Sequence, residues 1–455
     1  MNKEDLKSVL GLEALKNYEQ ISSYRYASLA YGLERVRTLL AAMNHPEKSL
    51  KCIHIAGTKG KGSTSYLTAS ILARHGYRVG LYTSPHLLSL NERIRLFHGD
   101  QEALIRSDVL SRLIQAALVH AEGMRIKGGI CAPTYFEVLT VVALAAFAEA
   151  QMEFAVLETG LGGRFDATNI VDPLVSVITP VSLDHTHLLG TTLKAIAREK
   201  AGVIKPGRPC ISMNREPVVL KVIRETAKRA RTFLIDAAAR SRFTHVELLP
   251  RESRFSLATD RRDYGSMKLS LPGEFQLENV AAAIHALEVV EGYGMPPMRV
   301  SAIKAACAKA RWPGRLQVLN ERPWVIVDGA HNEASALALR ASISRIYPHR
   351  RLLLVFAAAR DKDLPSMGKV LCPMASEVLL TSFDSPRASS PEEIMFAWKP
   401  HLRKSHVFMY PRVSAALEDA LSRAGKEDLV CVTGSLYAVA EALQARRKIA
   451  VGQSS

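Results

Sequence analysis

A glycine-rich segment with two lysines, residues 57–63, has the composition of a loop that binds phosphate groups. The segment reads GTKGKGS, and it joins an apolar run to a stretch in which apolar residues have helical spacing. A strand that leads through glycines into a helix directs several backbone N–H groups at one place, where the helix dipole adds partial positive charge. Lys61 adds a full positive charge there. We therefore expect this segment, the phosphate loop, to hold the phosphates of a nucleotide.

The spacing of the phosphate loop differs from the Walker pattern GxxxxGK[ST]. Gly57 and Gly60 stand three residues apart, and the hydroxyl comes at Ser63 rather than directly after Lys61. A glycine turn with a solvated lysine is the alternative interpretation. The order of strand, loop, lysine, hydroxyl and helix favours the phosphate site.

Three further apolar runs end in polar residues that could bind a metal or a substrate. The runs end at residues 83–87 (TSPHL), at 158–169 (ETGLGGRFDATN) and at 182–185 (SLDH). Ligands of open α/β sheets bind at loops that follow the carboxyl ends of parallel strands. The Ser84 hydroxyl can reach a metal carried by a nucleotide, and the Glu158 carboxylate suits Mg²⁺. His185 can bind a metal through a neutral imidazole nitrogen, with Asp184 as an orienting group.

Each of these residues also has an ordinary structural interpretation. Ser84 and His86 are typical turn residues, and a glutamate at a strand end often caps a segment or faces solvent. Lys200 lies in REKAG, residues 198–202, where a solvated lysine would be favoured by the dipole at a helix C-terminus. It is the whole set, rather than any one residue, that indicates a site.

The segments that must position these residues alternate between strand and helix up to about residue 235. Short apolar runs predict strands, and longer stretches with apolar residues three and four apart predict helices. This alternation predicts a parallel sheet with helices on both faces. The expected strands are 51–56, 79–83, 154–158 and 174–179, and the expected helices are 63–75, 135–150 and 193–201.

A second α/β series follows a change of pattern in the middle of the chain. Residues 243–271 predict irregular β structure, and residues 276–290 and 300–309 predict helices. Trp312-Pro313-Gly314 then breaks the pattern, and strands are expected at 324–327, 352–356, 378–381, 406–410 and 429–432. We place the main boundary near Arg311, which gives domains of residues 1–311 and 312–455.

Composition is that of a globular protein with a large core: 455 residues, 48% of them hydrophobic and 23% charged. Lys and Arg number 60 against 44 for Asp and Glu, and the net charge of +16 suits anionic ligands or nucleic acid. The six cysteines form no CxxC pair, which indicates reduced thiols. The charged N-terminus lacks a secretory pattern, and the apolar run 138–150 is too short to span a bilayer. We expect a cytoplasmic protein.

Taken together, these motifs resemble those of folylpolyglutamate synthase and the bifunctional dihydrofolate synthase, which are members of the Mur-ligase superfamily. TYFE at 134–137 and GLGGRFDATN at 160–169 are similar to the folate branch rather than to the cell-wall branch. The resemblance implies an N-terminal P-loop-type parallel-sheet ATPase domain followed by a smaller Rossmann-like α/β domain. It covers nearly the whole chain, with matching segments at 32–36, 57–63, 83–87, 134–137, 158–169, 183–185, 199–202, 312–315, 328–332, 361–363, 385–387 and 434–437.

The resemblance implies a role for each matching residue of the nucleotide and metal sites. Lys61 and the backbone amides of the phosphate loop would hold ATP, and Lys200 matches a lysine that is carbamylated in the family. Lys61, Glu158, His185 and Lys200 form the implied catalytic set. The implied ATP-binding residues are Lys59, Gly60, Lys61, Gly62, Ser63, Asn279, Arg315, Asp328 and His331, and the implied Mg²⁺ ligands are Ser84, Glu158 and His185.

The implied substrate residues form a pterin group and a glutamate group. Two residues depart from the family pattern: Phe275 stands where histidine is frequent, and Ala357 stands where glycine is usual. Neither departure removes a group that the chemistry requires. The pterin group is Thr134, Tyr135, Phe136, Glu137, Phe165, Asp166 and Ala167, and the glutamate group is Lys362, Arg387 and Ser435.

The implied activity is that of an ATP-dependent ligase. ATP would convert a pteroate or folyl carboxylate into an acyl phosphate, and the amine of L-glutamate would attack it. The implied partners are ATP, Mg²⁺, L-glutamate and dihydropteroate or folates, with no nucleic acid or membrane, for a monomeric enzyme. The sequence leaves open whether the enzyme adds the first glutamate, later ones, or both.

Two other functions stay open at this point. A Mur-type ligase of cell-wall precursor synthesis would use the same ATP chemistry on another acceptor. A basic nucleic-acid-binding P-loop protein would account for the net charge and for the five basic residues in the segment 221–231. No aromatic stacking pattern accompanies those charges, so a solvated helix face explains that segment better.

Overall fold

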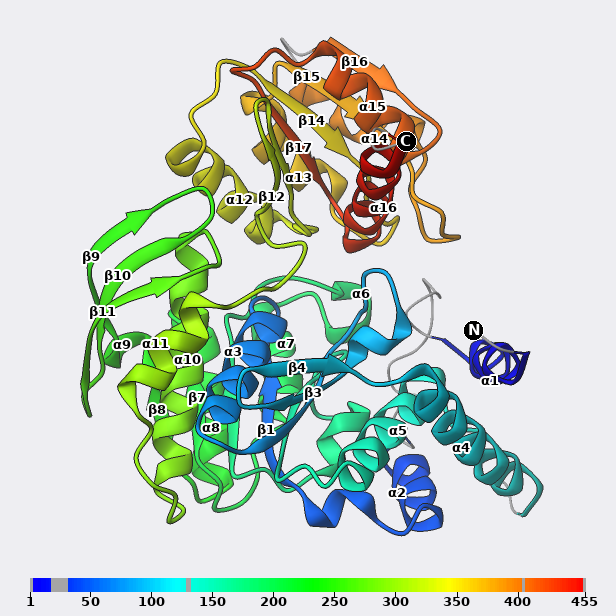
Figure 1. Ribbon diagram of the computed structural model, residues 1–455, viewed down its shortest axis with the longest axis vertical. Helices are drawn as coiled ribbons and strands as arrows, with labels where there is room; N and C mark the ends of the chain where they lie inside the picture. Colours follow the sequence, from blue (N-terminus) through cyan, green and yellow to red (C-terminus); the bar gives the residue numbers. More distant parts are fainter. Residues whose placement is uncertain (1–2, 18–31, 128–131, 403–405, 453–455) are drawn as a thin grey trace. The chain divides into compact units, whose positions relative to one another are not determined.

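The computed structural model describes residues 3–17, 32–127, 132–402 and 406–452 of the chain (Figure 1). The chain forms two compact units. The first contains Met1–Thr244, Ser256–Met267 and Glu278–Ala310, and the second contains His245–Phe255, Lys268–Leu277 and Arg311–Ser455. Two short stretches that precede residue 278 therefore fold with the second unit.

The first unit is built on a sheet of eight strands: β1 Lys51–Ala56, β2 Arg78–Tyr82, β3 Ile94–His98, β4 Gln101–Leu104, β5 Phe154–Glu158, β6 Val175–Ile178, β7 Cys210–Ser212 and β8 Leu234–Asp236. Their order is β4-β3-β2-β5-β1-β6-β7-β8. All neighbours pair in parallel except β2 with β3 and β3 with β4. The carboxyl ends of β1, β2, β5 and β6 therefore meet at one edge of the sheet.

Helices cover this sheet, and the most buried of them is α5 Tyr135–Glu149, which is apolar around nearly its whole circumference. The ring of Phe147 packs directly against Gly80 of β2. A Cβ at position 80 would lie 2.3 Å from Phe147 Cδ1, so a larger residue there would displace the ring. The other helices before the second series are α1 Lys3–Glu13, α2 Gly32–Ala42, α3 Lys61–Arg74, α4 Ser107–Lys127, α6 Thr186–Leu189, α7 Leu193–Ala201, α8 Pro217–Arg229, α9 Ala237–Arg240, α10 Glu274–Glu291 and α11 Val300–Ala308, with 3₁₀ turns at Pro46–Ser49, Leu90–Arg93 and Ala167–Ile170.

A separate sheet of three strands precedes α10: β9 Arg242–Leu248, β10 Ser253–Ala258 and β11 Asp263–Leu269. Its order is β11-β10-β9, and it is drawn in green in Figure 1. The β structure expected for residues 243–271 is thereby confirmed.

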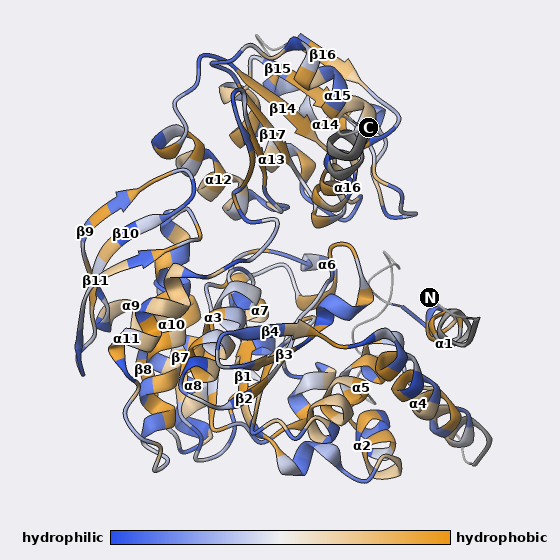
Figure 2. Ribbon diagram, viewed as in Figure 1, coloured by the Kyte–Doolittle hydropathy of each residue, from blue (hydrophilic) through white to orange (hydrophobic). Residues whose placement is uncertain are grey.

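The second unit is built on a sheet of six strands: β12 Gln317–Glu321, β13 Trp324–Val327, β14 Leu352–Phe356, β15 Glu377–Leu380, β16 His406–Met409 and β17 Leu429–Thr433. The order is β12-β13-β17-β14-β15-β16, and only β12 pairs antiparallel. Its central strands are hydrophobic along their length (Figure 2), as expected for parallel strands covered on both faces. The helices are α12 Glu333–Ile346, α13 Leu364–Leu371, α14 Pro391–Trp398, α15 Val413–Arg423 and α16 Leu436–Gly452, with 3₁₀ turns at Cys372–Met374 and Lys399–His401.

The structure confirms the expected α/β class, and the expected strands lie within a residue or two of the observed ones. The hairpin of β3 and β4 was not expected, because β4 is exposed throughout and carries no apolar run. In the described part of the chain no helix is long and apolar enough to cross a bilayer. The described cysteines are buried and form no disulfide. Cys131 lies outside the described residues.

Candidate active site

The phosphate loop leaves β1 and enters α3 through two glycines in unusual backbone conformations. Gly57 has φ 147° and Gly60 has φ 81°, both positive. A Cβ on Gly57 would lie 1.9 Å from Thr179 Oγ1, and one on Gly60 would lie 2.2 Å from Asn279 Oδ1. Both positions therefore require glycine. The close approach also places Asn279, a predicted nucleotide contact, directly against the loop.

The backbone amides of the loop have two different roles. The N–H groups of Thr58 and Lys59 donate to the carbonyl oxygen of Pro180, at 3.0 and 3.2 Å. Gly60 is the N-cap of α3, and the first N–H groups of a helix have no acceptor within it. The Lys59 amide thus fastens the loop to Pro180, just after the C-terminal end of β6. The amides of the first turn of α3, and the dipole of that helix, are directed toward a ligand.

Lys61, Glu158 and Ser84 come together at the carboxyl edge of the first sheet. Glu158 is the last residue of β5 and is only 5% exposed. Its Oε1 lies 3.8 Å from Lys61 Nζ, and its Oε2 accepts a hydrogen bond of 3.3 Å from the backbone N–H of Ser84. The structure therefore joins three residues that the sequence predicted for one site, from three different segments.

Lys200 is buried at the C-terminal end of α7, with 5% of its surface exposed. Its Nζ donates a hydrogen bond of 2.7 Å to the carbonyl oxygen of Gly57. Burial, together with the positive charge of Lys61, lowers the pKa of Lys200 from 10.5 to about 7, against the attraction of Asp184 and Asp166. A solvated surface lysine is excluded. The Lys200 amine is instead partly neutral near pH 7 and touches the phosphate loop.

His185 lies in the loop after β6, with a left-handed backbone at φ 48°. Its Nε2 is 3.9 Å from Asp184 Oδ1, which also accepts a hydrogen bond from the His185 backbone N–H at 2.9 Å. The loop is tied to the phosphate loop by Thr58, whose hydroxyl donates to Ser182 O and accepts from the Ser182 N–H. Asp184 thus hydrogen-bonds the His185 backbone and lies near its ring, on a loop that is hydrogen-bonded to the phosphate loop.

The segment after β5 is organised around the buried carboxylate of Asp166. Its oxygens accept hydrogen bonds from the backbone N–H of Leu161 at 2.8 Å and from the N–H and hydroxyl of Thr168 at 3.0 and 2.5 Å. Burial raises the pKa of Asp166, and these hydrogen bonds oppose the rise. Phe165 lies under the Arg164 guanidinium at 4.8 Å, and Ala167 is buried.

The predicted pterin residues at the start of α5 include a capping box. The Thr134 hydroxyl accepts from the Glu137 backbone N–H, and the Glu137 carboxylate accepts from the Thr134 backbone N–H at 2.7 Å. The same carboxylate accepts two hydrogen bonds from the buried guanidinium of Arg35, at 2.7 and 3.0 Å. Glu137 and Thr134 are thus occupied in holding the helix end. Tyr135 and Phe136 lie between them in the sequence.

Arg93 is a buried arginine that sequence reasoning missed. It is 2% exposed, its Nε donates a hydrogen bond of 2.9 Å to His86 Nδ1, and its guanidinium lies 5.6 Å from the centre of the Tyr135 ring. It therefore joins the loop after β2 to the start of α5. The only signal in the sequence is its position shortly after TSPHL, in a segment for which the sequence pattern predicts no element.

In the second unit, three predicted nucleotide contacts surround the exit of β13. Asp328 accepts hydrogen bonds of 2.9 Å from the backbone N–H groups of Leu316 and Ala330, and burial raises its pKa against the charge of Arg315. A Cβ on Gly329 would lie 2.5 Å from Arg315 Nη1. His331 Nδ1 is 2.8 Å from the carbonyl oxygen of Gly329. Arg315, Asp328 and His331 therefore form one cluster.

The predicted glutamate residues follow β14, β15 and β17, which are neighbours in the sheet. Asp361 holds both cations: Arg387 Nη2 lies 2.6 Å from Oδ1 and Lys362 Nζ lies 3.7 Å from Oδ2. Ser435 follows Gly434, where a Cβ would lie 2.4 Å from the carbonyl oxygen of Ala357. These residues therefore come from the segments that follow three parallel neighbouring strands, at one edge of the sheet.

The two departures from the family pattern are both accommodated within the second unit. Ala357 directly follows β14 and is buried. Phe275 packs against the hydrophobic core of the second unit.

Two family models match the chain over most of its length. Residues 55–287 match the Mur ligase middle domain, and residues 314–436 match the Mur ligase, glutamate ligase domain. The dihydrofolate synthase/folylpolyglutamate synthase of Bacillus subtilis is 36% identical over 433 residues, which cover 93% of this chain and 98% of the relative. That of Escherichia coli is 32% identical over 421 residues, covering 91% and 92%.

Solved structures show the same similarity. Mycobacterium tuberculosis folylpolyglutamate synthase complexed with ADP has a TM-score of 0.86 at 28% identity, covering 97% of this chain and 98% of that one. E. coli FolC in complex with DHPP and ADP has a TM-score of 0.77 at 30% identity, covering 94% and 99%.

The fold and the two matched domains define a Mur ligase. The chain belongs to the dihydrofolate synthase/folylpolyglutamate synthase family of these ligases, to which it is similar over nearly its whole length.

Proposed function

We propose that this protein uses ATP to join L-glutamate both to dihydropteroate and to the γ-carboxylate of folate. The observation that carries the proposal is the cluster of Lys61, Glu158 and the Ser84 amide beside the phosphate loop, with Lys200 donating to Gly57. The relatives named above with ADP and with DHPP support a nucleotide and a folate-type acceptor. The folate relatives favour this acceptor over a cell-wall precursor.

The chemistry follows from the charges of the reactants. A carboxylate is a poor electrophile, so the acceptor carboxylate is first converted to an acyl phosphate by the γ-phosphoryl group of ATP. The amine of glutamate then attacks the acyl carbon, an amide forms and phosphate leaves. Two anions meet in the first step, and Lys61 with the amides of the first turn of α3 would offset their repulsion.

The residue types predicted for the metal site suit a magnesium ion. Glu158 is a buried carboxylate and Ser84 a hydroxyl, and hard cations such as Mg²⁺ prefer oxygen ligands of this kind. His185 would be the third ligand, oriented by Asp184. Bound Mg²⁺ would neutralise phosphate charge, while the protein residues hold the phosphates in place.

Lys362, Arg387 and Ser435 would bind the incoming glutamate. A guanidinium and an ammonium are suited to carboxylates; Asp361 accepts a hydrogen bond from Arg387 and lies 3.7 Å from the Lys362 ammonium. The rings of Phe136 and Phe165 would contact the pterin. The engagement of Glu137 with Arg35 indicates that its part in that site is to hold Tyr135 and Phe136 in place.

The proposal is tested by an assay that depends on ATP and glutamate, with dihydropteroate and tetrahydrofolate offered separately. We expect product from both acceptors, and phosphate release that requires the acceptor. Glu158→Gln should raise the Mg²⁺ concentration needed for half-maximal rate more than it raises the KM for folate. Arg208→Gln, a change in an exposed ion pair with Asp172, is the matched control. Turnover of only one acceptor would reduce the proposal to a monofunctional enzyme.

A further inference from the structure

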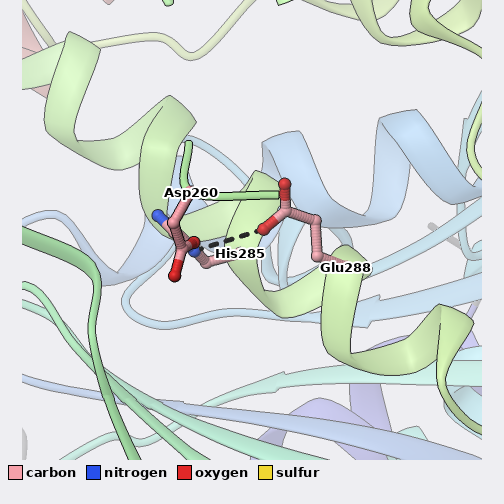
Figure 3. Close-up of side chains that lie close together, drawn as sticks. All are labelled: Asp260, His285 and Glu288. Carbon is pink, nitrogen blue, oxygen red and sulfur yellow. Dashed lines mark ion pairs between the residues drawn. The ribbon is translucent and has the colours of Figure 1, made fainter. Parts of the chain in front are cut away.

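Three potential metal ligands converge on α10, in residues to which the nucleotide and folate sites assign no role (Figure 3). Asp260 lies in the turn between β10 and β11, and His285 and Glu288 lie on α10. One ligand atom of each lies within 4.8 Å of the other two. His285 and Glu288 are 1% and 3% exposed, whereas Asp260 faces solvent.

The hydrogen bonds around Ser241 determine which nitrogen of His285 carries a proton. The Ser241 hydroxyl lies 2.8 Å from the carbonyl oxygen of Ala237, and a carbonyl can only accept, so the hydroxyl donates there. A hydroxyl has a single proton. Ser241 Oγ must therefore accept from His285 Nε2, 3.0 Å away. A neutral His285 consequently presents a lone pair at Nδ1.

Glu288 faces that lone pair with a carboxylate oxygen. The hydroxyl of Thr259 at 2.6 Å and that of Tyr264 at 2.8 Å both donate to Oε1, which stabilises the ionised form. The other oxygen, Oε2, lies 3.3 Å from His285 Nδ1. Two lone pairs at this distance repel each other, so a cation is required between them. That cation is either a proton on Nδ1 or a metal ion.

The separation of the two atoms also fits two ligands of one metal ion. Charge-assisted N–H···O bonds are shorter, about 2.7–2.9 Å. Two ligands that each lie about 2.0–2.2 Å from a tetrahedral zinc stand roughly 3.3–3.5 Å apart. Asp260 would supply a third ligand, because one of its carboxylate oxygens lies within 4.8 Å of the ligand atoms of His285 and Glu288.

We propose that Asp260, His285 and Glu288 form a site for a divalent transition metal, with Zn²⁺ the best match to one imidazole and two carboxylates. Ser241 is the positioning residue, because it fixes the ring orientation and directs the lone pair of Nδ1 at the ion. The ion would fasten the β10–β11 turn to α10, which makes this a structural site, separate from the magnesium site at Glu158.

The test is zinc titration of the full-length chain after chelator treatment, in competition with a chromophoric chelator. Wild type should bind one zinc more tightly than Asp260→Asn by about 10- to 100-fold, and Ser241→Ala should weaken the same binding by a similar factor. Asp260 is exposed, so Asp260→Asn keeps the fold. Asp263→Asn, which changes the exposed carboxylate of the first residue of β11, is the control and should bind zinc like wild type.

A second measurement separates the metal from the proton. Nitrogen NMR of the histidine rings should show His285 with Nε2 protonated and Nδ1 shifted by zinc. Equal zinc binding by wild type and Asp260→Asn would overturn the proposal. So would a His285 ring that stays protonated on both nitrogens at saturating zinc, because the cation between His285 and Glu288 would then be the proton.

Discussion

At the scale of single residues, Lys200 is the side chain whose state bears most on the reaction. An ammonium has three donors and no acceptor, so it cannot bind a metal and would repel one. Burial and the nearby charge of Lys61 bring its pKa to about 7, which leaves a substantial fraction as free amine at neutral pH. Free amine is the form that reacts with CO₂. The carbamylation implied by the family resemblance is therefore chemically accessible in this chain.

Replacing Lys200 by alanine should lower the ligase rate about 10- to 100-fold, the effect typical of a group that supports a metal site. The unfolding midpoint should change much less, and a small added carboxylic acid should restore part of the rate by occupying the vacated space. Carbon-13 NMR of wild type in labelled bicarbonate should show a carbamate signal. An alanine variant with full activity would remove Lys200 from the catalytic set.

Lys200 should also make the stability of the ligand-free protein depend on pH. Between about pH 7 and pH 10.5 the unfolded chain keeps the proton on this lysine while the folded chain has released it. Stability rises with pH wherever the unfolded state binds more protons. In CO₂-free buffer, the free energy of unfolding of wild type should therefore increase relative to Lys200→Met from pH 7 to pH 10. A difference that does not vary with pH would contradict the lowered pKa.

At the scale of elements, the ion pair between Arg35 and Glu137 joins α2 to the first turn of α5. Both side chains are buried, and the pair has bidentate geometry. The helix that it anchors carries the predicted pterin residues Tyr135 and Phe136. A change in this pair should therefore act on folate binding through the position of the helix.

Arg35→Met should destabilise the protein by about 3–5 kcal/mol, because it leaves the Glu137 carboxylate buried without its cation. Adding Glu137→Gln should recover part of that loss, since the amide keeps the cap on Thr134 without the buried charge. Urea unfolding of the two variants gives the measurement. If Glu137→Gln alone raised the KM for folate and left the unfolding free energy unchanged, Glu137 would be a direct substrate contact.

The elements that the sequence predicted well are those whose cause is local. Continuous apolar runs such as 154–158 and 352–356 identify buried parallel strands, and the Thr134 to Glu137 spacing is a local capping signature. What could not be predicted depends on residues far apart in the chain. The Lys200 contact with Gly57 spans 143 positions and the Arg35 pair spans 102. The roles in the second unit came from the family resemblance alone, because no local pattern marks a glutamate site.

At the scale of the whole molecule, the chain does not divide cleanly at the boundary near Arg311. Leu248 and Phe275 pack against the core of the second unit, and Tyr347 Oη donates to the carbonyl oxygen of Pro250. Arg251 pairs with Glu321 in the same unit. A fragment of residues 1–311 therefore carries two stretches whose packing partners are missing.

The fragment of residues 1–311 should form no amide bond, because it lacks the cluster at Asp328 and the cations at Asp361. We also expect it to bind ATP weakly and to expose apolar surface, measured by nucleotide titration and dye binding. The full-length chain with Arg387→Ala is the control: it keeps both units and should bind ATP normally while losing glutamate-dependent turnover. Full ligase activity from the fragment would show that the second unit is dispensable.

The path of the chain between the two units has a further consequence. The chain passes from one unit to the other after Thr244, Phe255, Met267, Leu277 and Ala310. A protease that cuts the turn at residue 261 produces two pieces, and each piece supplies strands or helices to both units. Such a nicked protein should keep its hydrodynamic size and fall apart only in denaturant.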